Sequence, residues 1–134
     1  MAVYENYKLK FVNKKVEIGN GRIDKSPQGI EEHRPYIGFL YSPLSIYLYI
    51  CGSSGGPKLI DEIIVALDDA LNGNIGDPDI SIEMTKATIL NNTTVEIKED
   101  NTNNVITLPI VDFKAILLEY KDFLNTPPLN GTML

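Results

Sequence analysis

The stretch CGSSGGPKLIDEIIVALDDALNGN, residues 51–74, contains the clearest helix signal in the chain. Pro57 suits the first position of a helix, where its missing N–H would have no partner in any case. Apolar residues then recur every three or four positions, and Asn72-Gly73 is a typical helix end. The pattern predicts a helix over about residues 57–72 with one apolar stripe packed on a sheet. That stripe comprises Ile60, Ile63, Ile64, Leu67, Ala70 and Leu71.

The residues before this helix are apolar and aromatic, and Pro43 divides them. A proline inside such a run favours two strands over one, so we expect strands at 36–41 and 45–51. In the second strand Tyr47 and Tyr49 would share one face. A tyrosine face is either the half-buried surface of a sheet or a contact surface for a partner.

The N-terminal part alternates aromatic or apolar residues with lysines over residues 7–12, which predicts a half-buried strand. A short second strand is expected around Val16 and Ile18. Residues 19–35 are punctuated by glycine and proline and have no apolar period, so they predict a loop.

The part after the helix has the pattern of an antiparallel meander. Alternation over 80–90 and 95–98 and the apolar run 105–108 predict three strands separated by polar turns. A second amphipathic helix follows, opening at Pro109 and ending near residue 124, and the tail 126–134 is expected to be frayed. We therefore predict one α+β domain spanning 1–134, with about five to seven antiparallel strands and two helices packed on the sheet.

The charge of the chain is acidic and uneven. Its net charge is −6: residues 1–56 hold seven Lys/Arg and five Asp/Glu, whereas 57–134 hold five and thirteen. An acidic half repels phosphate backbones and attracts basic proteins, so we expect a protein partner and no nucleic acid. No apolar run is long enough to cross a membrane, and the N-terminus lacks the apolar core of a signal peptide. We expect a cytoplasmic protein.

Candidate catalytic groups lack their partners. Residues 52–56 match the G-x-S-x-G pattern with Ser54 as nucleophile, and Cys51 precedes them. The single histidine, His33, lies upstream of the serine, whereas hydrolases with this motif place it downstream. A serine or cysteine without a base is not activated, so a small hydrolase using Ser54 or Cys51 is the weaker alternative. One cysteine and one histidine also exclude a Cys/His metal site, and we expect no cofactor or metal.

Acidic residues on the outer side of the predicted helix and in the meander are the candidate binding groups. Exposed carboxylates steer association with basic partners. Together with the tyrosines, the candidate partner-binding residues are Asp61, Glu62, Asp68, Asp69, Glu83, Glu96, Tyr47 and Tyr49.

The helix segment LIDEIIVALDDALNG, residues 59–73, resembles a helix of the small immunity proteins of contact-dependent growth inhibition systems. In those proteins an aromatic, Ser-Pro-interrupted strand precedes the helix, and a β-meander with a C-terminal amphipathic helix follows it. The resemblance covers about residues 36–124. The chain departs from the family in its Pro-Pro tail and in the long Gly/Pro-rich segment near its N-terminus, so the resemblance does not indicate which toxin is its partner.

The resemblance implies a cytoplasmic inhibitor that binds and blocks a toxin domain, often a basic nuclease, and that needs no chemistry of its own. A third possibility from the residues is a non-catalytic adaptor or oligomer-forming subunit that pairs through its tyrosine strand or an exposed sheet edge.

Overall fold

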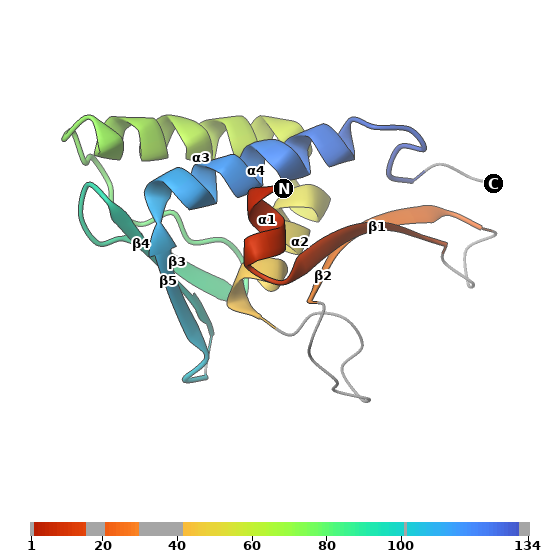
Figure 1. The fold of residues 1–134 in the computed structure, drawn as a ribbon, viewed down its shortest axis with the longest axis horizontal. Coiled ribbons are helices and arrows are strands. Elements are labelled where there is room, and N and C mark those ends of the chain that lie inside the picture. The colour runs from red at the N-terminus through yellow and green to blue at the C-terminus, as the bar shows by residue number, and fades with distance from the viewer. Residues whose placement is uncertain (1, 16–20, 30–41, 101, 132–134) are drawn as a thin grey trace.

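The computed structural model describes residues 2–15, 21–29, 42–100 and 102–131, which form an α+β fold with two separate antiparallel sheets (Figure 1). The α+β class agrees with the prediction. The predicted arrangement of one sheet covered by two helices is wrong, because the described strands form two sheets and the described residues include four helices. The described elements are α1 (Val3–Asn6), β1 (Leu9–Lys15), β2 (Ile23–Gly29), α2 (Pro43–Ser54), α3 (Gly56–Leu71), β3 (Thr85–Ile89), β4 (Thr94–Glu99), β5 (Val105–Pro109) and α4 (Ile110–Leu124).

Helix α2 lies at the centre of the molecule. Eight of its twelve residues are buried, on every side of the helix, because it packs against α3, β2 and the sheet β3–β4–β5. A helix that is apolar all round belongs in an interior. Its largest fully buried side chain, Tyr47, donates a hydrogen bond from its hydroxyl to the carbonyl of Ile80 at 2.6 Å.

The predicted strand at 45–51 is therefore wrong, since these residues belong to α2. An uninterrupted apolar run does not distinguish a buried strand from a buried helix. The helix start was nevertheless encoded: the hydroxyl of Ser42 accepts the N–H of Ser45 at 3.1 Å, and Pro43 occupies the first turn. The predicted strand at 36–41 lies outside the described residues.

Helices α3 and α4 lie side by side and cover α2 (Figure 1). The predicted boundaries of both helices are confirmed to within about one residue. The expectation that α3 packs on a sheet is wrong: Ile60, Ile63 and Leu67 are buried where α3 packs on α2 and α4. Helix α4 also contacts β4 and β5. Helices α2 and α4 therefore form a layer between α3 and the three-stranded sheet.

The predicted meander is confirmed as the sheet β3–β4–β5. Ala87 pairs with Ile97, and Ile97 pairs with Ile106, so one face of the sheet is apolar and covered by α2 and α4. The first strand begins only at Thr85, because Met84 has a positive φ of 68° in a turn. Residues 79–82 contribute isolated bridges to β3 instead of a continuous strand.

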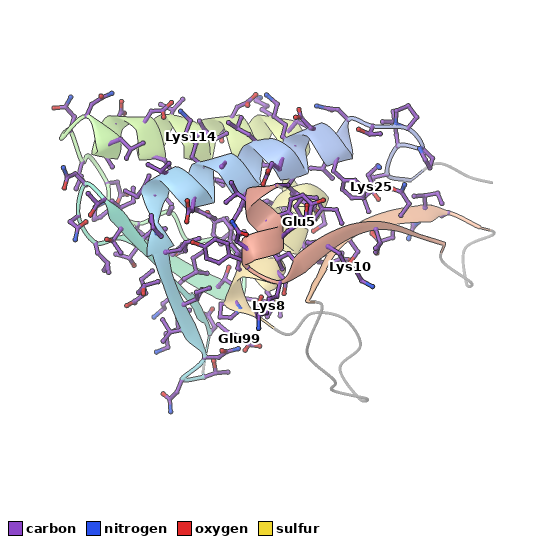
Figure 2. The ribbon with its side chains drawn as sticks, viewed as in Figure 1. Glu5, Lys8, Lys10, Lys25, Glu99 and Lys114 are labelled. Carbon is purple, nitrogen blue, oxygen red and sulfur yellow. The ribbon has the colours of Figure 1, made fainter. Side chains whose placement is uncertain are left out.

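The second sheet is a hairpin of β1 and β2, and it corrects the predicted loop at 19–35. Residues 23–29 form a strand whose backbone pairs along its whole length with β1. Lys25 (Figure 2) links the hairpin to α4. Its ammonium donates a hydrogen bond to Oδ1 of Asn13 on β1 at 2.7 Å, and it lies 4.0 Å from the ring centre of Phe123 on α4. The segments 16–20 and 30–35, with the strand expected around Val16 and Ile18, lie outside the described residues.

Both ends of the described chain are tied to the fold. The N–H groups of Val3 and Tyr4 donate to the carboxylate of Glu119 at 2.9 and 3.0 Å, which fixes α1 on α4. The expected frayed tail is corrected as far as Gly131, whose N–H donates to the carbonyl of Ile23 at 2.9 Å. The C-terminal segment thus lies against β2.

Candidate functional site

Both predicted nucleophiles, Cys51 and Ser54, lie on helix α2. Cys51 is fully buried, and desolvation raises the pKa of its thiol to about 12, so the reactive thiolate is scarce at neutral pH. Ser54 lies in the last turn of α2, so the strand–turn–helix context of a nucleophile elbow is absent. His33, the only histidine, lies outside the described residues.

Metal binding and membrane insertion find no support in the described ranges. Within them, three or more His, Cys, Asp or Glu side chains nowhere come together as a metal site would require. None of the helices there combines the length and apolar character needed to cross a bilayer.

Two of the predicted acidic residues join α3 to α4. Asp61 Oδ1 lies 2.6 Å from Lys121 Nζ, and Asp68 Oδ1 lies 2.6 Å from Lys114 Nζ. The partners are seven residues apart on each helix, so the two helices run antiparallel. Lys114 lies over the seam between the helices (Figure 2). Both pairs are accessible to water, so they stabilise the fold only modestly.

The other two acids of α3 point outward. Glu62 and Asp69 are exposed, and neither has an ion-pair partner among residues that the structure describes. Val65 lies between them on the same side of the helix and is 60% exposed. Helix α3 therefore exposes an apolar side chain flanked by two carboxylates that form no ion pair within the described ranges.

An apolar residue of α4 continues this surface. Leu118 is 41% exposed, and by its position between Lys114 and Lys121 it falls opposite Val65, between the two ion pairs. An apolar centre with a charged rim has the composition of a protein interface. We call this surface the α3–α4 face, defined by Asp61, Glu62, Val65, Asp68, Asp69, Lys114, Leu118 and Lys121.

The remaining predicted residues lie elsewhere. Glu96 is on the face of β4 opposite the buried Val95 and Ile97, and Glu83 is exposed in the turn before β3. Both are therefore away from the α3–α4 face. The prediction that Tyr47 and Tyr49 share one face of a strand is wrong, because both residues are on helix α2 and Tyr47 is fully buried.

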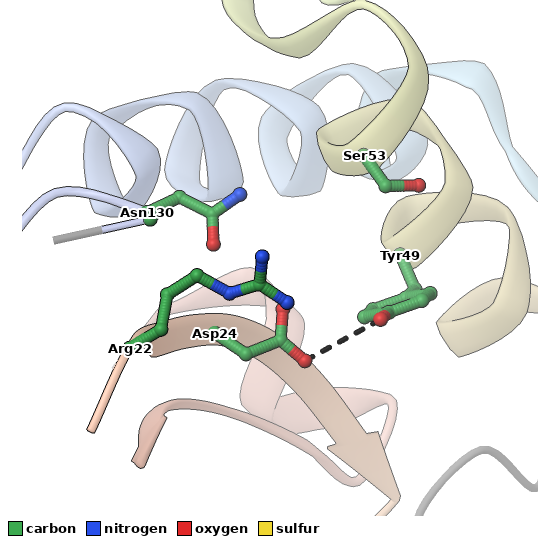
Figure 3. A pocket seen from close by; sticks show the side chains of 6 residues that line it. Arg22, Asp24, Tyr49, Ser53 and Asn130 are labelled. Atoms are coloured by element: carbon green, nitrogen blue, oxygen red, sulfur yellow. Dashed lines mark hydrogen bonds between the residues drawn. The ribbon is translucent and has the colours of Figure 1, made fainter. Parts of the chain in front are cut away.

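Tyr49 instead lines a polar pocket that sequence reasoning missed (Figure 3). Its hydroxyl lies 3.3 Å from Asp24 Oδ2, and burial, followed by the charge and hydrogen bond of Asp24, raises its pKa. Arg22 and Asn130 come to the same pocket from distant parts of the chain. The complete lining consists of Arg22, Asp24, Tyr49, Ser53, Asn130 and Gly131. No local motif in the sequence marks these residues as neighbours.

Comparison of the chain with protein-family models, with curated proteins and with solved structures found no match.

Proposed function

We propose that the chain is a non-catalytic inhibitor that binds and neutralises a toxin domain with a basic surface, in the manner of immunity proteins of contact-dependent growth inhibition systems. The observation that carries this proposal is the α3–α4 face, where the exposed Val65 is flanked by the carboxylates of Glu62 and Asp69, which form no ion pair with any residue in the described part of the chain. This surface offers both a charge that attracts a basic protein and an apolar group that can be buried on contact.

The ion pairs of the α3–α4 face support the same role. Lys121 and Lys114 of α4 pair with Asp61 and Asp68 across the helix seam, so the acidic groups of α3 are presented beside a packed neighbouring helix. A surface that needs no rearrangement loses less entropy on binding. Exposed carboxylates also accelerate encounter with a basic partner, an effect that weakens as salt rises.

The alternative of a hydrolase is disfavoured by the burial of Cys51 and by the helical position of Ser54. An inhibitor requires neither group to react. We propose that it acts in the cytoplasm, where a toxin that has entered the cell meets its target.

Protection of growing cells tests this proposal. The proposal predicts that a gene beside that of this chain encodes a large secreted protein, and the C-terminal domain of that protein is the toxin to express. Its expression should arrest growth, and co-expression of this chain should restore growth. A Ser54→Ala, Cys51→Ala double variant should protect equally well, because no chemistry is involved. Loss of protection in that folded variant would instead support the hydrolase.

A further inference from the structure

The pocket in Figure 3 carries two opposite charges that the proposed inhibitor function does not use. It is a cavity of about 250 Å³ between β2, the end of α2 and the segment after α4. The guanidinium of Arg22 and the carboxylate of Asp24 both line it. The pocket is distinct from the α3–α4 face, with which it shares no residue.

The two charged side chains of the pocket, Arg22 and Asp24, have unused hydrogen-bonding capacity. The side chain of Arg22 has neither an ion pair nor a hydrogen bond to any residue in the described ranges. Its five N–H groups form a fork that fits a carboxylate. Asp24 accepts one long hydrogen bond, 3.3 Å from the Tyr49 hydroxyl, which leaves lone pairs for a second donor.

Tyr120 does not line the pocket, but its hydroxyl packs on Gly52 of α2, next to the lining residue Ser53. Tyr120 is fully buried, and no hydrogen bond reaches its hydroxyl. This oxygen lies against the backbone of Gly52, and burial raises the pKa of the Tyr120 hydroxyl.

A second buried hydroxyl, that of Ser26 on β2, lies outside the residues that line the pocket. Ser26 is fully buried and its oxygen is also without a hydrogen bond. It is two residues from Asp24, so the two side chains share one face of the strand, the face turned toward α2.

We propose that this pocket binds a small zwitterion, a free α-amino acid in its simplest form, with its carboxylate on Arg22 and its ammonium group on Asp24. A plain anion would be repelled by Asp24, and a plain cation by Arg22, whereas a zwitterion satisfies both charges. The volume equals that of about eight water molecules at ~30 Å³ each, which suits a small amino acid.

Titration of the full chain with glycine, alanine and serine, followed by amide NMR shifts, tests this inference. At least one amino acid should give saturable shifts at residues of β2 and α2, whereas acetate and methylammonium, which carry one charge each, should not. Arg22→Gln and Asp24→Asn should each weaken the binding about tenfold or more, since each removes a charged hydrogen bond. Lys114→Gln on the α3–α4 face should leave the binding unchanged.

Three results would overturn the inference. No saturable shift with any of the amino acids means that the pocket holds water only. Equal binding of acetate or methylammonium rules out recognition of both charges. Binding that survives both Arg22→Gln and Asp24→Asn places the ligand elsewhere. If Asp24→Asn does not fold, Arg22→Gln decides alone, because its exposed side chain contributes little to the core.

Discussion

The hydroxyl of Tyr120 rests directly on the backbone of Gly52: a Cβ at position 52 would lie 2.6 Å from the oxygen. This contact lets α4 approach α2 closely at the C-terminal part of the central helix. It also explains why a glycine occurs inside α2, where it would otherwise weaken the helix.

Gly52→Ala should therefore destabilise the fold, by about 1–3 kcal/mol, although this exchange ordinarily stabilises a helix. Chemical denaturation measures the change. Gly76→Ala is the control, because a Cβ there meets nothing within 4 Å, and its effect should be small. Adding Tyr120→Phe to Gly52→Ala should recover part of the loss, and equal losses in the single and double variants would show that the hydroxyl is not the obstacle.

Glu119→Ala should release α1 from α4. The carboxylate of Glu119 caps the first two N–H groups of α1, and loss of a helix cap costs about 0.5–2 kcal/mol. Hydrogen exchange at Val3 and Tyr4 should accelerate in this variant. Glu62→Ala, an exposed glutamate of α3, is the matched control and should change the free energy of unfolding by less than about 0.5 kcal/mol. Unchanged exchange in Glu119→Ala would contradict the capping role.

The protein should lose stability as the pH rises from about 9 toward 12. Burial raises the pKa of the Cys51 thiol to about 12, and burial together with the hydrogen bond to Asp112 raises the pKa of Tyr7 to about 12. The unfolded chain ionises these groups at lower pH, so it releases protons first and is favoured as the pH rises.

Denaturation midpoints between pH 7 and 11 measure this alkaline loss, and Tyr7→Phe should reduce it. A thiol reagent at pH 8 provides the second readout: Cys51 should react only when the chain unfolds. Rapid labelling of the native protein would show that the thiol is accessible.

Elements with one clear periodicity could be predicted from the sequence. Helices α3 and α4 have an apolar stripe with a polar opposite side, and β4 alternates Val95 and Ile97 with polar residues. In each case the element is buried on one side only, so the side-chain pattern reports the backbone geometry.

The elements that were missed have no such pattern. Helix α2 is buried on all sides, so its apolar residues show no period, and Ser42-Pro43 was the only usable signal of its start. Strand β2 contains Lys25, Ser26 and Pro27 and is stabilised by pairing with β1. The pocket depends on Arg22 and Asn130 meeting across the fold, which no local pattern encodes.

The two ion pairs between α3 and α4 should contribute little stability. Their side chains are 29–55% exposed, and pairs of this kind are typically worth about 0.2–1 kcal/mol. A double-mutant cycle with Asp68→Asn and Lys114→Gln measures the coupling, which should fall as salt is added. A coupling above about 2 kcal/mol would mean that these acids serve the fold more than a partner.

Affinity for the toxin domain at low salt, compared between two charge-reversal pairs, tests the central claim most directly. Glu62→Lys with Asp69→Lys alters the α3–α4 face, and Glu83→Lys with Glu96→Lys makes the same charge change away from that face. The first pair should weaken binding roughly tenfold or more, with a smaller effect at higher salt, while the second pair leaves it nearly unchanged. Equal losses from both pairs, or a loss from the second alone, would contradict the assignment of the partner to the α3–α4 face.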